Sequence, residues 1–127
     1  VLDVGAAYAD AAGRVHPDTV ELGAGILSGL SLRGGLHKWA SAVSFTTTLT
    51  FDAGGNPDTV WIMQIAGSLV LETGARVTLM NGAKASNIFW QIAGEAQILA
   101  GAHAEGVILC KTAIIFGSEG SLNGRGL

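Results

Sequence analysis

The side chains that could perform acid, base or nucleophilic chemistry are few and scattered in this sequence. It has ten carboxylates, three histidines and one cysteine among 127 residues. His16, His37 and His103 lack metal-ligand spacing, and Cys110 lies in an apolar run with no neighbouring base. One cysteine also excludes an internal disulfide. The sequence therefore predicts no metal site, no nucleophilic centre and no cofactor.

Two further kinds of site find no support in the residue pattern. Enzymes that cleave polysaccharides need paired carboxylates, and the repeats described below bring no two of Glu72, Glu95 and Glu105 side by side. Gly23-Ala24-Gly25 lacks the third glycine of a dinucleotide-binding fingerprint, because position 28 is Ser28. We therefore expect no enzyme.

The composition points to a folded, strand-rich protein. Charged residues make up 13% of the chain and hydrophobic residues 49%, with 19 glycines that suit tight turns. A net charge of -3 without a basic stripe argues against nucleic acid and anionic membrane surfaces as partners. The longest apolar runs are far shorter than the roughly 18 residues that a membrane helix needs. We expect a chain that does not cross a bilayer.

The predicted secondary structure, which must position any functional side chain, changes from helix to strand early in the chain. Residues 1–12 are rich in alanine, and Val1, Val4 and Tyr8 share one helical stripe before Gly13 ends it. From Gly23 onward, short alternating runs are separated by glycine and polar turn residues. The pattern predicts one helix followed by a mainly β domain.

Two internal repeats give the β domain its architecture. Met63-Gln64-Ile65-Ala66-Gly67 is echoed from Trp90 onward, at an offset of 27, and Ala104-Glu105-Gly106 is echoed from Leu122 onward, at an offset of 18. The shorter offset suits one coil of a three-sided β-helix, and the longer one suits the same coil with a loop of about nine residues near positions 81 to 87. The offsets predict two inward columns, which are Leu69, Ala96 and Ile114, and Leu71, Ile98 and Phe116.

Several ordered motifs then resemble one family. They are Ala7-Tyr8-Ala9-Asp10-Ala11-Ala12-Gly13-Arg14, Gly35-Leu36-His37-Lys38-Trp39, Thr59-Val60-Trp61-Ile62-Met63-Gln64-Ile65, the run from Asn81 to Gln91, Glu105-Gly106-Val107-Ile108-Leu109, Lys111-Thr112-Ala113 and Ser121-Leu122-Asn123-Gly124-Arg125. Together they resemble the microbial ice-binding (antifreeze) proteins. The resemblance implies a right-handed three-sided β-solenoid with one α-helix packed along it. It also implies a secreted, non-enzymatic protein that inhibits ice growth and recrystallisation.

The chain of 127 residues has room for one domain, and the resemblance implies that residues 1–127 form a single ice-binding domain. The start at Val1 and the end after a strand-like run suggest that neither is a natural terminus. Compared with the family, we expect it to lack N-terminal coils and the extreme C-terminal strand. Edges left bare by such a truncation would favour association of an otherwise monomeric chain.

The resemblance also implies which surface contacts ice. Stacked strands repeat at about 4.8 Å, close to an ice lattice repeat, and small or hydroxyl-bearing side chains order water without binding it tightly. The resemblance places the ice-binding face on the strand that begins at Thr112, and the repeat offsets give the equivalent residues in the other coils. The residues expected on this face are Ala42, Ser44, Ser68, Val70, Glu95, Gln97, Thr112, Ala113 and Ile115. Glu95, Gln97, Val70 and Ile115 depart from the small or hydroxylated residues expected there.

Two alternatives remain open at this stage. A second row of hydroxyl-bearing residues, Thr46, Thr48 and Thr50 continued by Thr78, competes with the first, although threonine is common on solvated strands. An extracellular adhesin or carbohydrate-binding solenoid is the second function. Tyr8, Trp39, Trp61 and Trp90 could then stack on sugars, whereas packing between helix and solenoid, and within the core strands, is the simpler account.

Overall fold

The structure, a computed structural model, describes residues 19–20 and 25–126, and this part of the chain is built of short parallel strands. The helical element that lies wholly within it is the single 3-10 turn η2 (Ala85–Asn87). The helix expected over residues 1–12 lies outside the described residues and stays a prediction. The expectation of a mainly β chain is confirmed, in the form of a curled parallel sheet.

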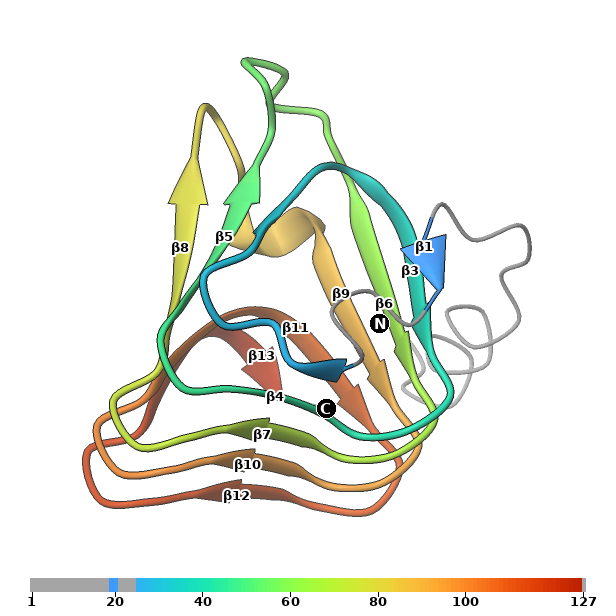
Figure 1. The fold of residues 1–127 in the computed structure, drawn as a ribbon. Coiled ribbons are helices and arrows are strands. Elements are labelled where there is room, and N and C mark those ends of the chain that lie inside the picture. Colours follow the sequence, from blue (N-terminus) through green and yellow to red (C-terminus); the bar gives the residue numbers. More distant parts are fainter. Residues whose placement is uncertain (1–18, 21–24, 127) are drawn as a thin grey trace.

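The strands lie in three rows around a common core (Figure 1). We call the outer sides of these rows Face 1, Face 2 and Face 3. Face 1 belongs to a separate four-stranded sheet made of β4 (Val43–Phe45), β7 (Leu69–Leu71), β10 (Ala96–Ile98) and β12 (Ile114–Phe116).

The other two rows form one nine-stranded sheet that bends around the core. Face 2 is the outer side of β2 (Ser31–Leu32), β5 (Thr48–Asp52), β8 (Arg76–Met80) and the first residues of β11 (His103–Cys110) and β13 (Ser121–Gly126). Face 3 is the outer side of β1 (Thr19–Val20), β3 (Gly35–Trp39), β6 (Trp61–Ile65), β9 (Ile88–Ile92) and the ends of β11 and β13. The sheet is continuous because β11 passes from the second row into the third.

The pairing of the strands confirms both repeats. Ala96 pairs with Leu69 and with Ile114, which are the partners that the offsets of 27 and 18 predict. Ser121 pairs with His103, as the shorter offset again requires. The long repeat differs from the short one by a loop at residues 81–87, close to where the sequence placed it, between β8 and β9.

Both long loops between strands of the described residues lie at one corner of the fold. Residues 53–60 and residues 81–87 both connect Face 2 to Face 3. In the next coil β11 turns the same corner without a loop, at Gly106, whose φ of 121° disfavours other residues. A Cβ there would also lie 3.0 Å from the side chain of Ile88. The corners that flank Face 1 carry no such loop in the described residues.

Alternate residues of each strand point inward and fill the core. Trp39, Trp61 and Trp90 are fully buried, and the ring of Phe51 meets the rings of Trp61 and Trp90 edge-on at centroid distances of 5.5 and 5.6 Å. The Trp61 Nε1–H donates to the carbonyl oxygen of Leu32, and that of Trp90 to the carbonyl oxygen of Glu105. These two large side chains are thus packed with their polar atoms satisfied.

The two predicted inward columns hold except at their last members. Leu69, Leu71, Ala96 and Ile98 are at most 1% exposed, whereas Ile114 is half-buried and Phe116 is 47% exposed. The expectation that Phe116 lies in the core is wrong. The physical reason is position, because β12 is the edge strand of its sheet and has a neighbour on one side only.

Candidate functional site

Face 1 presents one outward residue at the middle of each of its strands. Ser44 pairs with Val70, Val70 with Gln97, and Gln97 with Ile115, so the four side chains form one straight row. An isolated β-bridge pairs Ile26 with Ser44 and so extends the row by one residue, which is 62% exposed. Each neighbouring pair of strands keeps all three of its residue pairs. The row is therefore uninterrupted from β4 to β12.

A second row of Face 1 lies beside the first. The backbone N–H groups of Val43, Leu69 and Ala96 donate to the carbonyl oxygens of Ser68, Glu95 and Ala113 in successive coils. The residues in this row are Ala42, Ser68, Glu95 and Ala113. The structure thus brings together eight of the nine residues that the repeats assigned to this surface.

Thr112, the ninth residue, lies at the corner before Ala113 rather than in either row. Its hydroxyl donates to the carbonyl oxygen of Gly94 at 2.9 Å and links two coils at that corner. The transfer by repeat offset could not show this, because the offset gives a residue's coil but not the direction of its side chain.

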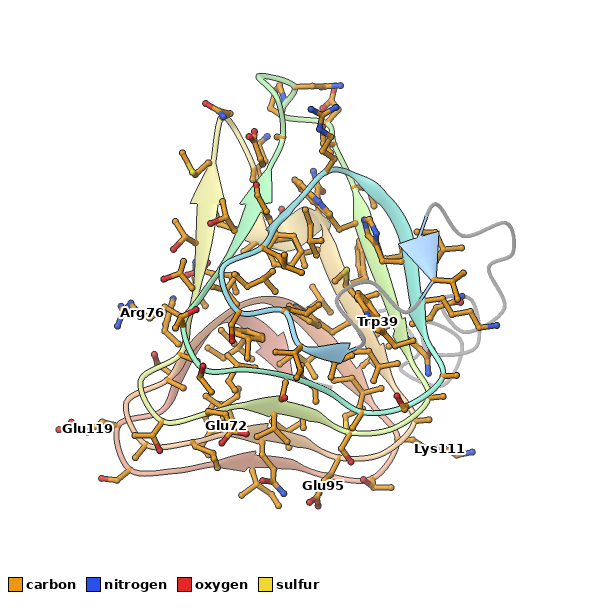
Figure 2. All side chains as sticks on the ribbon, in the orientation of Figure 1. Trp39, Glu72, Arg76, Glu95, Lys111 and Glu119 are labelled. Carbon is orange, nitrogen blue, oxygen red and sulfur yellow. The ribbon has the colours of Figure 1, made fainter. Side chains whose placement is uncertain are left out.

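Glu95 and Gln97 put an acid and an amide on this surface. The Gln97 Nε2 donates to Glu95 Oε1 at 2.5 Å, and Ser68 Oγ accepts the Glu95 backbone N–H at 3.3 Å. Figure 2 shows Glu95 directed away from the core. The departure noted in the sequence is therefore real, and the two long side chains are held against each other.

Glycine keeps the coils of Face 1 close at the corner it shares with Face 3. A Cβ on Gly94 would lie 2.5 Å from Ser68 Oγ and 2.9 Å from the carbonyl oxygen of Gly67. A Cβ on Gly67 would lie 2.7 Å from the backbone nitrogen of Ala42. The coils stack there with no space for a side chain.

The competing threonine row does not form one surface. The Thr46 backbone N–H donates to Ser28 Oγ at 2.8 Å, beside the rows of Face 1. Thr48 and Thr50 lie on β5, where Thr48 pairs with Arg76 and Thr50 with Thr78. Thr50 and Thr78 are therefore neighbours on Face 2, and Thr46 lies around the corner from them.

A polar cluster on Face 2 escaped the sequence analysis. His103 Nδ1 lies 2.7 Å from Ser121 Oγ, His103 Nε2 contacts a Glu105 carboxylate oxygen, and Asn123 Nδ2 donates to the other oxygen at 2.7 Å. The sequence offset of 18 had placed Glu105 level with Asn123, and that pairing is confirmed. His103 was missed as a partner although it lies two residues before Glu105 and therefore on the same side of β11. This network ties the last two coils together.

Other chemistry has little to build on in the described part of the chain. It contains no group of three or more histidine, cysteine or acidic side chains able to hold a metal ion. Cys110 Sγ lies 3.1 Å from the carbonyl oxygens of Gly94 and Ala113. The three tryptophans proposed as a sugar-stacking set are fully buried and cannot lie against a ligand, while Tyr8 is outside the described residues.

The whole chain matches one family model. Residues 1–127 match the model described as ice-binding-like. The chain belongs to this ice-binding family. Its similarity to an ice-binding protein of Colwellia sp is 49% identity over 125 residues, which are 98% of this chain and 49% of that protein. An ice-binding protein of Leucosporidium sp. is 48% identical over 94% of this chain and 45% of its own length.

Solved structures of ice-binding proteins have the same fold. An ice-binding protein from an Arctic yeast superposes with a TM-score of 0.85 at 38% identity, covering 94% of this chain and 58% of that chain. One from Antarctomyces psychrotrophicus gives 0.80 at 28% identity, covering 98% and 64%. The present chain spans about half the length of the curated relatives it matches.

Proposed function

We propose that this chain is a non-enzymatic ice-binding, or antifreeze, domain that adsorbs to ice through Face 1 and inhibits ice growth and recrystallisation. Its family and the names of its relatives support the activity. The observation that carries the surface assignment is the complete three-residue register maintained across β4, β7, β10 and β12.

The fold proposed for this domain is a right-handed, three-sided β-solenoid with one α-helix packed along it. The regular return of the chain to the same row, at offsets of 18 and 27, supports the solenoid. Face 3 supports a covering element, because four of its outward residues, Leu36, Gln64, Gln91 and Leu109, are at most 8% exposed, whereas Val20 and Lys38 on the same face are exposed. Outward side chains on Face 1 are half-buried or exposed, as a surface that meets ice requires.

Ice presents an ordered lattice of water instead of a pocket or a charge. Parallel strands about 4.8 Å apart offer side chains at a regular interval, which suits a lattice with a similar repeat. Ala42, Ser44, Ser68 and Ala113 are small, so ordered water can lie close to the backbone between them. Val70 and Ile115 add hydrocarbon that binds no competing solvent.

The test is to place a bulky side chain on Face 1 and, as a control, on Face 2. Ala42→Tyr and Ala113→Tyr should abolish thermal hysteresis and ice recrystallisation inhibition, because a protruding ring holds the rest of Face 1 away from ice. Thr78→Tyr is the matched control, since Thr78 is also exposed but lies on Face 2. Circular dichroism should show that all three variants are folded.

Two outcomes would overturn the proposal. If the unmodified chain leaves ice crystals with unaltered shape and growth rate, the chain does not bind ice by itself. If Thr78→Tyr abolishes activity and the Face 1 variants retain it, the surface is misassigned although the function stands.

The proposed partner is an ice crystal surface met outside the cell, as the family resemblance implies. In the described residues no helix is long and apolar enough to span a membrane. We propose a monomer that can associate through open sheet edges such as β12, where Ile115 and Phe116 are 45% and 47% exposed. The adhesin or carbohydrate-binding alternative loses support, because the tryptophans that would stack on sugars are buried.

A further inference from the structure

Two of the four asparagines in this chain precede a glycine, at Asn81-Gly82 and Asn123-Gly124. At such a step the backbone nitrogen of the glycine can attack the side-chain carboxamide of the asparagine. Glycine favours the attack, because it has no Cβ to keep its nitrogen away from the carbonyl carbon. The other two asparagines precede Pro57, which has no N–H, and Ile88, which is β-branched and fully buried. The sequence thus offers two candidate positions for this reaction.

Asn81-Gly82 forms the tip of a turn at the end of β8. Asn81 has a φ of 54° and Gly82 a φ of 92°, and the Ala83 backbone N–H closes the turn by donating to the carbonyl oxygen of Met80 at 3.2 Å. Both tip residues are exposed. The Gly82 backbone N–H donates no hydrogen bond within the described part of the chain. The attacking nitrogen is therefore unpaired, and the reacting groups can rotate without disturbing the core.

Asn123-Gly124 is also exposed, but its backbone is held. Gly124 lies inside β13, which pairs with β11 over six consecutive residues. A Cβ on Gly124 would collide with the carbonyl oxygen of Gly106, so the two backbones lie tightly together there. The Asn123 carboxamide donates to Glu105 Oε1 at 2.7 Å. Attack at this position requires local opening of the sheet, so the fold separates two sites that the sequence leaves alike.

We propose that Asn81 is a site of spontaneous covalent modification. The Gly82 nitrogen attacks Cγ of Asn81 and forms a C–N bond, and the bond from Cγ to Nδ2 breaks. The side-chain nitrogen leaves as ammonia, which carries away the proton of the Gly82 N–H. Water then opens the resulting succinimide ring at either of its carbonyl carbons. The products are aspartate and isoaspartate at position 81, and the net reaction exchanges ammonia for water.

The modification would loosen the corner between Face 2 and Face 3. Asn81 Nδ2 donates to Asp52 Oδ1 at 2.8 Å, and the Asn81 carbonyl oxygen accepts the Gly55 backbone N–H at 2.9 Å. Aspartate at position 81 cannot donate the first bond and puts a second carboxylate beside Asp52. Isoaspartate also lengthens the backbone by one methylene group, which displaces the second bond. Because this corner does not border Face 1, the inference does not depend on the proposed ice binding.

The test is peptide mapping of the folded chain after incubation in mildly alkaline buffer. Trypsin cleaves after lysine and arginine, so residues 77–84 carry Asn81 and residues 112–125 carry Asn123, each as the only asparagine of its peptide. Residues 77–84 should gain about 1 Da with time, as ammonia is exchanged for water. Residues 112–125 should gain it at least about tenfold more slowly, because hydrogen bonds of the sheet must first be broken. In guanidinium chloride the two peptides should convert at similar rates.

Two matched variants check the assignment on the intact chain. Each conversion adds one negative charge to the formal net charge of -3, so ion-exchange chromatography separates the product. Asn81→Gly keeps the positive φ and should give no acidic product in the folded chain, whereas Asn123→Gly should give as much as the unmodified chain. The inference fails if residues 77–84 of the folded chain gain no mass, if residues 112–125 convert as fast, or if Asn81→Gly still accumulates the acidic product. Ice recrystallisation inhibition should be the same in Asn81→Gly and the unmodified chain.

Discussion

Face 1 and Face 2 are made by the same coils, yet only Face 1 stays regular from its first strand to its last. Along Face 1, β10 keeps three residue pairs with β7 and three with β12. Along Face 2, β5 and β8 keep five pairs, whereas β8 and β11 share only one, between Arg76 and His103. Face 2 ends at the corner that carries the loops at residues 53–60 and 81–87, and the insertions disturb it.

The chemistry of the two faces differs less than their geometry. Face 2 has the better pair of threonines, Thr50 and Thr78, but also Asp52, Arg76 and the cluster around His103. Face 1 has fewer hydroxyl groups and still bears Glu95. Unbroken strand register therefore favours Face 1 over Face 2 as a surface for a lattice, whereas residue type alone would have favoured the threonines of Face 2.

The largest expected effect comes from truncating one core residue beneath Face 1 and one beneath Face 2. Leu71 under Face 1 and Leu49 under Face 2 are both 0% exposed, so Leu71→Ala and Leu49→Ala should each lower the free energy of unfolding by roughly 2–5 kcal/mol. Urea denaturation measures this. At a temperature where both variants are folded, Leu71→Ala should lose more ice recrystallisation inhibition, because β7 relaxes into the cavity. Equal losses would mean that Face 1 has no privileged role.

A smaller effect is expected from the glycine corner where the coils of Face 1 lie close together. Gly94→Ala forces a methyl group to within 2.5 Å of Ser68 Oγ and should cost about 1–3 kcal/mol through overpacking. The displaced coil should also reduce ice activity. Gly101→Ala is the comparison, because its Cβ meets nothing within 4 Å and its cost comes only from a φ of 69°. If Gly101→Ala harms ice activity as much as Gly94→Ala, backbone spacing on Face 1 is not what matters.

The next test replaces the acid and the amide on Face 1, which are Glu95 and Gln97. Glu95→Ala combined with Gln97→Thr should strengthen ice binding, since a charge pressed against ice loses hydration. Removing even about 1 kcal/mol of that cost corresponds to roughly a fivefold lower protein concentration for the same inhibition. Arg76→Ala takes a charge from Face 2 instead and should leave the activity unchanged. A weaker double variant would show that the Glu95–Gln97 pair contributes to binding.

Much of this architecture was predictable because stacking converts sequence offset into spatial neighbours. The echoes at offsets of 18 and 27 placed Leu69 beside Ala96 and Gln97 beside Ile115, and both pairings are confirmed. The exposure of Phe116 was not predictable, because it depends on β12 being an edge strand. Side-chain direction at corners was not predictable either, so the repeats could not show that the Thr112 hydroxyl bonds to the carbonyl oxygen of Gly94. The contact between His103 and Glu105 requires two rotamers that no repeat specifies.

The smallest expected effect is a pH dependence confined to Face 2. The hydrogen bond from Asn81 Nδ2, the backbone N–H of Gly54 and the nearby Arg33 together hold the pKa of Asp52 below its usual 3.8. A carboxyl whose pKa is lowered on folding contributes stability above its unfolded pKa and loses it as the pH falls through the folded pKa. The Tm advantage of the unmodified chain over Asp52→Asn should therefore be small at about pH 6 and should shrink as the pH falls below the usual carboxyl pKa of 3.8. Ice activity, measured at neutral pH, should be equal in the two chains, because Asp52 lies on β5 and not on Face 1. A Tm difference that instead grows on acidification would mean that the carboxyl group is not stabilised in its charged form.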